Sequence, residues 1–458
     1  MTGNSTGPSS AEQGAEPLIA PGEHGNAAGH HNNAPHRASV EEHIRRLAEV
    51  LSTALRARRT ETLPIGANRL AGRVSAQRIT APMGLPGFDN SQMDGFALRS
   101  ADLALPEAEL PAAGIAPAGS APQQLPERTA IAVMTGAPIP DGADLVIPVE
   151  KTQDGFKDAQ RGGTVRFHGL AAEDLVAGTF IRRAGSDIAA GDVLAEAGQR
   201  LTPAVLGALA GCGVAQVPVL EQIRTLLVST GEEIRAPGET LSPGELYDAN
   251  GALLTGVLEE LGHQVRSAQL ATDQPESFGE QLDALLAEHR PHLLVTVGGV
   301  SAGAYEVVRQ TFGQRGVSFG SVAQQPGGPQ GWGTLHTGQH QTGVICLPGN
   351  PVSAAVSLET LVRPALTDAA PETPPQRRIE VRLAEPLTSK LGVAQYRRVT
   401  LRPGNGGEPS ATPVGGPSSH LLGHLARADA LLELTPQDTD VPAGAPRTAL
   451  LLPGRSAP

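Results

Sequence analysis

The sequence predicts a multidomain protein that combines a parallel α/β sheet domain with two β domains and a split domain of helices and strands. Three observations support this fold class. The chain has 458 residues, which is too many for a single hydrophobic core. Between residues 221 and 370, continuous apolar runs alternate with helical patterns, as in a parallel sheet covered by helices. Segments 86–183 and 376–458 contain short apolar runs between turns rich in glycine and proline, which is typical of β domains.

Composition excludes several classes of function. The chain has 47 acidic and 35 basic residues, a balance that argues against a general nucleic-acid or membrane-surface binder. It contains no apolar run of about 18 residues, and its first residues lack the pattern of a secretory signal. Cys212 and Cys346 are the only cysteines, so neither a disulfide framework nor a thiolate zinc site is expected. We therefore expect a cytoplasmic protein that binds no nucleic acid and no membrane.

The N-terminal part is expected to consist of a disordered tail followed by a helix. Residues 1–38 are rich in glycine, serine, asparagine and proline and show no apolar periodicity. Ser39 and Glu42 form a capping-box pattern, and apolar residues follow at helical spacing. We interpret this apolar stripe as a core or dimer-interface face.

Two segments that are separated in the chain are expected to form the split domain. They are residues 39–85 and 184–220. Thr202 and Pro203 predict the start of a second helix, because a capping residue followed by proline at the first turn favours a helix. We expect this second segment to pack on the first helix.

Residues 86–183 are expected to form a β domain without helices. Two apolar runs, 128–136 and 143–150, are predicted to be strands joined by a turn that contains two prolines and a glycine. After a linker at 371–375, residues 376–458 are expected to form a second β domain that resembles a barrel.

The predicted α/β domain spans residues 221–370. Its strands are expected at 224–231, 264–270, 292–299 and 342–349. Helices are expected at 250–261, with Asn250 as the cap, at 275–288, after residue 299, and at 352–366. This order predicts that four strand ends meet at one edge of the sheet, where ligands bind in such folds.

Residues that could bind a ligand or take part in catalysis follow each of these strands. The four strand ends are Ser229–Glu233, Thr272–Asp273, Gly298–Gly303 and Leu347–Ser353. Glycines allow a ligand to approach the backbone, and the N–H groups at a helix start attract anions, so we expect a phosphate-bearing ligand. Carboxylates do not bind phosphate directly, so Glu233 and Asp273, with Asp248 as a further candidate, indicate a bridging Mg²⁺.

Two loops of the first β domain add candidate residues. In the run Leu85–Arg99, Asp94 is followed by Gly95, which allows a sharp turn that exposes the carboxylate. Such a loop suits a metal, a phosphate or an oxyanion, and it also suits a turn that bonds to its own backbone. Thr135 is predicted on a second turn, as a ligand contact or only a turn hydroxyl.

Taken together and in this order, the motifs resemble the molybdopterin molybdenumtransferase family (MoeA type), which shares its pattern with the E domain of gephyrin. The motifs are 85–99, 134–144, 229–234, 246–250, 298–303 and 346–353. The resemblance implies a MogA-like, molybdopterin-binding α/β domain. It also implies Mg²⁺-dependent insertion of molybdate into adenylylated molybdopterin with release of AMP, by a homodimer whose cleft lies between the α/β domain of one subunit and the β domain of its partner.

The candidate residues are assigned from the motifs and from this resemblance. The catalytic candidates are Asp94, Thr135, Asp187 and Glu233. The metal-ligand candidates are Glu233, Asp273 and Glu306. The substrate-binding candidates are Gly298, Gly299, Ser301, Pro348, Gly349, Asn350, Pro351, Ser353, Arg398 and Ser419.

Three positions depart from the family pattern. Glu306 replaces an aspartate, and Gln325 and Gly328 replace lysines that many members carry. Molybdate is a dianion, so arginines, helix N-termini or Mg²⁺ would supply the missing positive charge.

Two other functions remain open at this point. One is adenylylation of molybdopterin, which consumes ATP and releases pyrophosphate. The other is a non-catalytic paralogue that binds molybdopterin or scaffolds other proteins, which would bind ligands without releasing AMP. The sequence also leaves open whether tungstate replaces molybdate.

Overall fold

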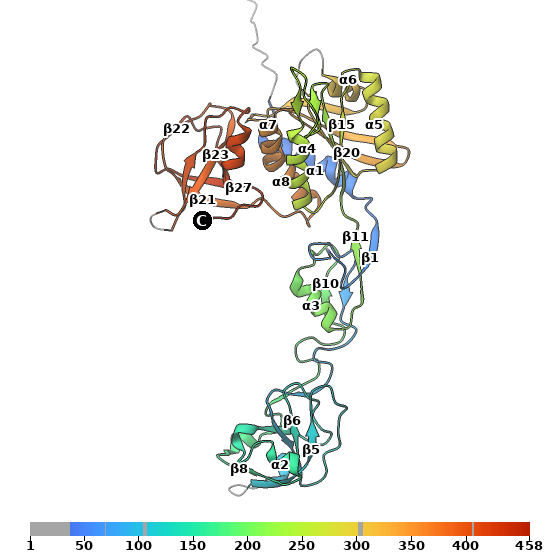
Figure 1. Cartoon of the computed structure of the whole chain (residues 1–458), viewed down its shortest axis with the longest axis vertical. Helices are drawn as coiled ribbons and strands as arrows, with labels where there is room; N and C mark the ends of the chain where they lie inside the picture. The colour runs from blue at the N-terminus through green and yellow to red at the C-terminus, as the bar shows by residue number, and fades with distance from the viewer. Residues whose placement is uncertain (1–36, 69, 104–107, 301–305, 405–406) are drawn as a thin grey trace, which may run out of the picture. The chain divides into compact units, whose positions relative to one another are not determined.

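The computed structural model describes residues 37–458, with gaps at 69, 104–107, 301–305 and 405–406 (Figure 1). The predicted tail therefore lies outside the described residues except for Arg37 and Ala38. Ala38 forms a parallel β-bridge with Val322, so the chain is paired immediately before its first helix. None of the helices in the described part is long and apolar enough to cross a membrane.

The α/β region contains a six-stranded sheet in which the four predicted strands are parallel neighbours. The order is β15 (Gln264–Leu270), β12 (Arg224–Thr230), β16 (Leu293–Val297), β20 (His340–Leu347), β19 (Pro329–Thr337) and β17 (Val317–Ser321). The four predicted strands pair in parallel, which confirms the parallel sheet, and two strands that were not predicted, β19 and β17, extend it with antiparallel pairings at one edge. These two strands escaped prediction because glycines and polar residues interrupt their apolar pattern.

Helices cover both faces of this sheet (Figure 1). One face packs on α5 (Pro275–His289) and α6 (Val307–Gly313), which contribute Phe278 and Phe312 to the same core as Val228. The opposite face packs on helices that share a core with Leu227. These are α1 (Val40–Leu55), α4 (Ala249–Glu260), α7 (Pro351–Ser357) and α8 (Arg363–Ala369). Apolar strand residues therefore alternate between two buried cores, as the continuous apolar runs indicate.

Helix α1 forms as predicted but packs elsewhere. The Ser39 side chain accepts a hydrogen bond from the Glu42 N–H at 3.1 Å. Leu47 and Leu51 are fully buried in the core of the α/β region, together with Ile345 of β20. The stripe is therefore a core face, and the expectation that residues 184–220 pack on this helix is corrected.

Two further predictions for the helices of the α/β region need correction. Asp248 rather than Asn250 caps α4, because its carboxylate accepts a hydrogen bond from the Gly251 N–H at 2.8 Å. The helix predicted at 352–366 is interrupted by a π-helical turn, Leu358–Val362.

The two segments on either side of the first β region are joined by strand pairing. β1 (Thr60–Pro64) pairs with β11 (Gln216–Leu220), and β2 (Ile79–Thr80) pairs with β10 (Val193–Ala195). The predicted helix is α3 (Pro203–Gly211), and the Thr202 hydroxyl accepts a hydrogen bond from the Val205 N–H. The boundaries 39–85 and 184–220 stay a prediction.

The first β region, predicted at 86–183, contains a five-stranded sheet. The order is β7 (Leu145–Pro148), β4 (Gly95–Leu98), β6 (Ala130–Val133), β5 (Ala108–Ala116) and β8 (Thr164–Phe167). A separate pair, β3 (Asn90–Ser91) and β9 (Ile181–Arg182), lies next to the Asp94 loop in sequence. A short helix, α2 (Lys157–Arg161), contacts β5 and β8, so the expectation of a region without helices is wrong.

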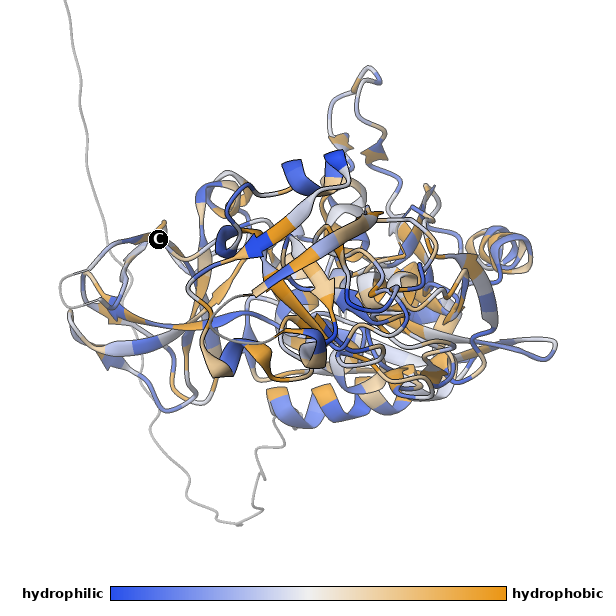
Figure 2. Ribbon diagram, turned by 90° about the horizontal axis from the view of Figure 1, so that it is seen from below, coloured by the Kyte–Doolittle hydropathy of each residue, from blue (hydrophilic) through white to orange (hydrophobic). Residues whose placement is uncertain are grey.

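The C-terminal region forms a closed ring of strands, as expected for a barrel. The ring runs β23 (Ala394–Arg402), β24 (Ser410–Pro413), β21 (Arg378–Leu383), β27 (Pro446–Leu451) and β25 (Ala430–Leu434), which pairs with β23 again. Helix α9 (Leu422–Arg427) was not predicted. β18 (Gln324–Gln325), from the α/β region, pairs in parallel with β23. In the ribbon of Figure 2, several strands carry orange, hydrophobic residues, whereas the helices alternate hydrophilic and hydrophobic residues along their length.

Candidate functional site

The four parallel strands end at one cavity of about 680 Å³. Its lining includes residues from each predicted strand end, among them Thr230, Glu233, Asp273, Gly298, Gly299, Pro348, Gly349, Asn350 and Pro351, together with Glu306. We call this the strand-end cavity. Its existence agrees with the rule that parallel sheets place ligand sites beyond the carboxyl ends of their strands.

Glycine is required where two of the loops approach each other. Gly298 has φ +103°, and a Cβ atom there would lie 2.7 Å from Thr230 Oγ1. A Cβ atom at Gly349 would lie 3.2 Å from the Gly298 Cα. The cavity floor is therefore built from backbone that a larger side chain would displace.

The Gly349–Asn350 turn is held by hydrogen bonds on both sides. The Asn350 side chain accepts a bond from the Val352 N–H at 3.1 Å and thereby caps α7. The Asn250 amide donates to the Gly349 carbonyl at 2.8 Å. Asn250, predicted as a helix cap, is therefore a buried residue that positions this turn.

Three predicted metal ligands line the strand-end cavity, namely Glu233, Asp273 and Glu306. Partial burial raises the pKa of Asp273, and the nearby carboxylates of Glu232, Glu233 and Glu306 raise it further. Among the described residues, no group of three or more Asp, Glu, His or Cys side chains is placed so that it could hold a metal ion, so these carboxylates share a cavity without forming a ready-made metal cage. An all-oxygen set that needs further ligands fits Mg²⁺, which is usually held by one or two carboxylates and by substrate phosphates.

The fourth acid that lines the cavity, Asp248, has a structural role. Asp248 also lines the cavity, but it is buried and its carboxylate caps α4. The suggestion that it is a metal ligand therefore loses its basis. Ser301 lies outside the described residues. Ser353 is buried within α7, and it is not among the residues that line the cavity.

Asp94 and Thr135 are brought together in the first β region. One Asp94 carboxylate oxygen accepts hydrogen bonds from the Thr135 N–H at 2.6 Å and from the Thr135 hydroxyl at 2.8 Å. These bonds lower the pKa of Asp94. A side chain at Gly95 would overlap the Ile147 carbonyl group, so glycine permits the close pairing of β4 with β7.

The other polar residues of the Asp94 loop divide into two groups. Asn90 and Ser91 donate to carbonyl groups two residues away, those of Phe88 and Met93, as a local turn would. Asp89 instead accepts bonds from the Arg183 side chain at 2.5 Å and from the Ala184 N–H at 2.8 Å. The loop is thus only partly a self-bonded turn, and its two aspartates hold distant segments together.

Asp187 is exposed in the loop beside Leu85, to which its backbone N–H donates at 3.1 Å. Asp94, Thr135 and Asp187 are absent from the lining of the strand-end cavity. Within the described part of one chain, the predicted catalytic residues therefore do not share one site: Glu233 lines the strand-end cavity, Asp94 and Thr135 are bonded to each other, and Asp187 lies beside Leu85.

Arg398 and Ser419 belong to a third location, in the C-terminal barrel. Arg398 is buried and donates to the Ser418 carbonyl at 3.0 Å and to the Gly416 carbonyl. Burial and the neighbouring Arg397 lower the pKa of Arg398. Neither Arg398 nor Ser419 lines the strand-end cavity. In this structure, Arg398 orders the loop that carries Ser419.

Of the three positions that depart from the family pattern, Glu306 lines the strand-end cavity, whereas Gln325 and Gly328 belong to the segment in which β18 pairs with the barrel strand β23. The Gln325 side chain accepts a hydrogen bond from the Gln395 amide at 2.9 Å. Gly328 is next to Pro329, which lines the strand-end cavity.

Sequence reasoning missed the apolar wall of the strand-end cavity. Ile234, Leu246 and Tyr247 line it, from the short strands β13 (Ile234–Arg235) and β14 (Leu246–Tyr247). The motif at 246–250 marked this segment, but apolar residues beside polar strand ends resemble ordinary core residues in a sequence.

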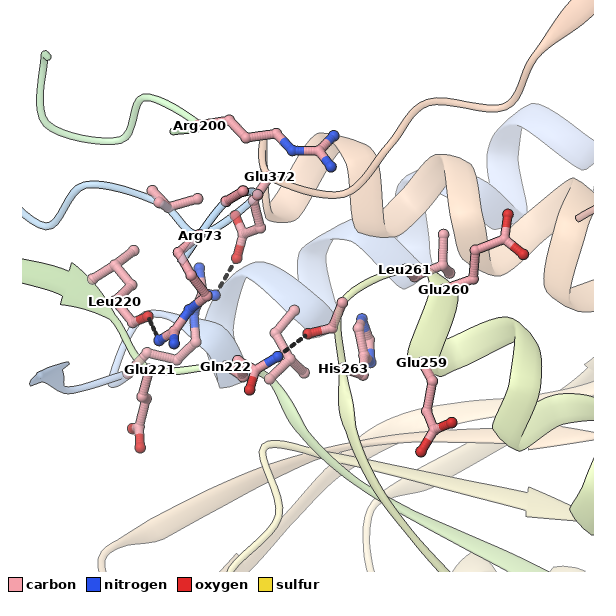
Figure 3. Close-up of a pocket in the computed structure, with 16 residues that line it drawn as sticks. Arg73, Arg200, Leu220, Glu221, Gln222, Glu259, Glu260, Leu261, His263 and Glu372 are labelled. Atoms are coloured by element: carbon pink, nitrogen blue, oxygen red, sulfur yellow. Dashed lines mark hydrogen bonds and ion pairs between the residues drawn. The ribbon is translucent and has the colours of Figure 1, made fainter. Parts of the chain in front are cut away.

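A second cavity, of about 370 Å³, lies away from these residues (Figure 3). Several of its polar groups already have partners. Arg58 pairs with Glu372, Arg73 donates to the Leu220 carbonyl, and Gln222 donates to the Gly262 carbonyl. Among the predicted site residues that the structure describes, none lines this second cavity, so the strand-end cavity remains the candidate site.

Comparisons with known proteins agree with this arrangement. Three family models match in order: the MoeA N-terminal region (domains I and II) at residues 38–213, a probable molybdopterin binding domain at 227–368, and the MoeA C-terminal region (domain IV) at 380–452. The chain is similar to a solved structure described as a molybdopterin biosynthesis MoeA protein from Pyrococcus horikosii, with a TM-score of 0.71 and 26% identity. That match covers 91% of this chain and 99% of the other.

Two curated relatives are similar over most of their length. Molybdopterin molybdenumtransferase 2 of Mycobacterium tuberculosis is 40% identical over 420 residues, which cover 89% of this chain and 97% of the relative. Molybdopterin molybdenumtransferase of Haemophilus influenzae is 32% identical over 392 residues, which cover 84% and 92%. Together with the three consecutive family models, these matches show that the chain belongs to the MoeA family of molybdopterin molybdenumtransferases.

Proposed function

We propose that the protein is a molybdopterin molybdenumtransferase that inserts molybdate into adenylylated molybdopterin and releases AMP with the help of Mg²⁺. The observation that carries this proposal is the strand-end cavity. It combines close-packed glycine loops, a turn fixed by Asn250 and Asn350, and carboxylates that raise the pKa of Asp273. A site for a phosphate group next to a site for a divalent cation is the combination that this reaction requires.

The residues of the cavity divide the work between binding and charge compensation. Gly298 and Gly349 let the two loops pack closely against each other, and their glycine backbone would leave main-chain N–H groups accessible to a phosphate. Glu233, Asp273 and Glu306 would hold Mg²⁺, which supplies positive charge next to phosphate and molybdate oxygens. The protein then contributes orientation and electrostatic stabilisation and little covalent chemistry.

Asp94 completes the proposed site from a second subunit of a homodimer. Within one chain, Asp94 does not line the strand-end cavity, yet Thr135 holds its carboxylate in one orientation with two hydrogen bonds. A carboxylate that is ordered, exposed and ionised suits a contact that forms only on assembly. In this proposal Thr135 is a positioning residue for Asp94.

Although Gln325 and Gly328 stand where many family members have lysines, this part of the molecule still carries positive charge. Arg397 is buried, and burial alone lowers its pKa. Its guanidinium donates to the side-chain amide oxygen (Oε1) of Gln395 at 3.3 Å, and the Gln395 amide in turn donates to Gln325. We therefore retain metal insertion over a purely scaffolding role.

Reconstitution from purified components tests the proposal. The protein is mixed with adenylylated molybdopterin, Mg²⁺ and molybdate, and AMP is measured by chromatography while active cofactor is measured by activation of an apo-molybdoenzyme. We expect AMP and active cofactor to appear together, and neither without Mg²⁺. ATP consumption with pyrophosphate release would instead identify an adenylyltransferase, and ligand binding without AMP release would identify a scaffold. Replacing molybdate with tungstate in parallel assigns the preferred oxyanion.

We also propose a cytoplasmic location. Cys212 and Cys346 are both buried and unpaired, which suits a reducing compartment. Fractionation of cells that express a tagged chain tests this location.

A further inference from the structure

One wall of the strand-end cavity is formed by apolar side chains that are exposed to solvent. Leu246 is 60% exposed and Tyr247 is 46% exposed. Both line the cavity, and so does Ile234 on the paired strand. Exposed apolar groups that line a concave site, rather than being scattered singly, indicate a binding surface.

This wall is held rigidly by the segment that carries it. The Tyr247 hydroxyl donates to the Glu239 carbonyl at 2.8 Å. The Arg235 guanidinium pairs with Glu245 at 2.5 Å and donates to the Glu232 carbonyl at 2.7 Å. An aromatic ring fixed in this way loses little conformational entropy when a ligand covers it.

The wall and the strand ends give the cavity two chemically different parts. Thr230, Asn350 and the glycine loops provide polar and backbone groups, whereas Ile234, Leu246 and Tyr247 provide apolar surface. A ligand that fills both parts needs a charged phosphate group attached to a flat, apolar-faced ring. Aromatic side chains stack with heteroaromatic rings of this kind.

We propose that Tyr247 is a substrate-binding residue that stacks on the heteroaromatic ring of the ligand, with Leu246 and Ile234 completing the ring subsite. This inference rests on the proposed function, because that function supplies a ligand with phosphate and ring in one molecule. Two rings of that ligand have the required chemistry, the adenine and the pterin. In this arrangement the ring subsite binds the heteroaromatic ring, and the loops at the strand ends bind the phosphate group.

The test measures binding by calorimetry, with the full chain and three probes: AMP, ribose 5-phosphate and molybdopterin. Tyr247→Ala removes the ring, and Tyr247→Phe keeps the ring but removes the hydroxyl that tethers Glu239. Leu391→Ala is the control, because Leu391 is 68% exposed and does not line the cavity.

We expect Tyr247→Ala to weaken binding of either AMP or molybdopterin about fivefold or more, from the loss of one stacking contact. Tyr247→Phe keeps the ring and should lose much less affinity than Tyr247→Ala, Leu391→Ala should bind like the unmodified chain, and ribose 5-phosphate should bind all variants equally. The ring-bearing probe that Tyr247→Ala weakens identifies the stacked ring.

Three results would overturn the inference. They are unchanged binding of both ring-bearing probes by Tyr247→Ala, equal losses in Tyr247→Ala and Tyr247→Phe, and an equal loss for ribose 5-phosphate. If Tyr247→Ala leaves binding of both ring-bearing probes unchanged and alters only the oligomeric state, the apolar wall is a subunit contact and not a ligand-binding surface. Failure of the proposed function is recognised separately, because AMP and cofactor production are not measured in this test.

Discussion

Asp94 in the first β region and Asp273 at the strand ends are carboxylates in opposite electrostatic settings. Hydrogen bonds from Thr135 lower the pKa of Asp94. Burial and neighbouring acids raise the pKa of Asp273. The first carboxylate is therefore stabilised as an anion by its own protein, whereas the second gains most from a cation that the protein does not supply.

This contrast separates positioning from binding. One carboxylate oxygen of Asp94 is held by two hydrogen bonds from Thr135, and the side chain is exposed. The strand-end cavity gathers carboxylates that raise the pKa of Asp273, and in the proposed function Mg²⁺ would relieve this repulsion. Asp94 is exposed, which a purely stabilising role would not require. Asp273 has three other acids near it, which would be unfavourable if its only role were to stabilise the fold.

The largest effect is expected at the centre of the strand-end cavity. Glu233→Gln removes a carboxylate but keeps the size of the side chain, and we expect AMP release to fall about 100-fold or more because one metal ligand is lost. The measurement is Mg²⁺-dependent AMP release, with dimer content followed by light scattering. Glu232→Gln is the matched control, since Glu232 does not line the cavity, and its activity should stay within about threefold. Normal turnover by Glu233→Gln would remove the metal role from this residue.

The next effect concerns the backbone that shapes the cavity. Gly298→Ala should destabilise the protein by roughly 2–4 kcal/mol, because φ +103° disfavours alanine and its Cβ would press on Thr230. Gly136→Ala is the control, since Gly136 has φ +79° with open space around it, and it should cost only about 1–2 kcal/mol. Chemical denaturation compares the two variants. Equal losses would mean that the close approach of the loops has no energetic role.

A smaller effect is expected at the Asp94–Thr135 pair. Thr135→Ala removes the hydroxyl bond but keeps the backbone N–H bond to Asp94, so AMP release should fall about tenfold, and Thr135→Ser should restore it. Asp94→Ala should cost more than Thr135→Ala. If Thr135→Ala is as inactive as Asp94→Ala, then Thr135 itself contacts the substrate.

The smallest effect is a pH shift. Because the pKa of Asp273 is raised, acidification should weaken Mg²⁺ binding at a higher pH than an ordinary aspartate would. In Glu232→Gln one repelling charge is absent, so the midpoint of this loss should move to lower pH. Calorimetric titration of Mg²⁺ across weakly acidic pH measures the midpoint. A midpoint that does not move would indicate that Glu232 does not act on Asp273.

The same shift has a consequence for stability. Because the pKa of Asp273 is higher in the folded protein than in the unfolded chain, protonated Asp273 favours folding. This stabilisation is lost as the pH rises through the folded-state pKa and the carboxylate ionises. Without Mg²⁺ at neutral pH, Asp273→Asn should therefore raise the melting temperature slightly. With Mg²⁺ that advantage should disappear, because the carboxylate then has a cation partner.

The sequence could predict much of the fold because the relevant patterns are local. The apolar runs of β12, β16 and β20 and the caps at Ser39 and Thr202 are visible in single segments. The packing of α1 could not be predicted, because an apolar stripe indicates that a helix is buried but not which sheet covers it. β17 and β19 were missed because pairing in the sheet overrides a weak strand pattern.

The candidate site was predictable where topology dictates it and not elsewhere. Four strand ends of a parallel sheet must meet, so Glu233, Asp273 and Gly298 could be placed together from order alone. The Asp248 cap could not be predicted, since a carboxylate before a helix suits a cap and a metal site equally. Tyr247 was missed because its exposure depends on the parallel pairing of β13 with β14, which single-segment patterns do not reveal.

Complementation between two inactive variants tests the shared site most directly. Asp94→Ala and Glu233→Gln chains are mixed under conditions that exchange subunits, and AMP release is compared with that of each variant alone. In a heterodimer, one site would combine an intact Glu233 with an intact Asp94 from the partner, so the mixture should recover about a quarter of the unmodified activity. If subunits exchange and the mixture remains inactive, the two carboxylates do not meet across subunits, and the account is contradicted.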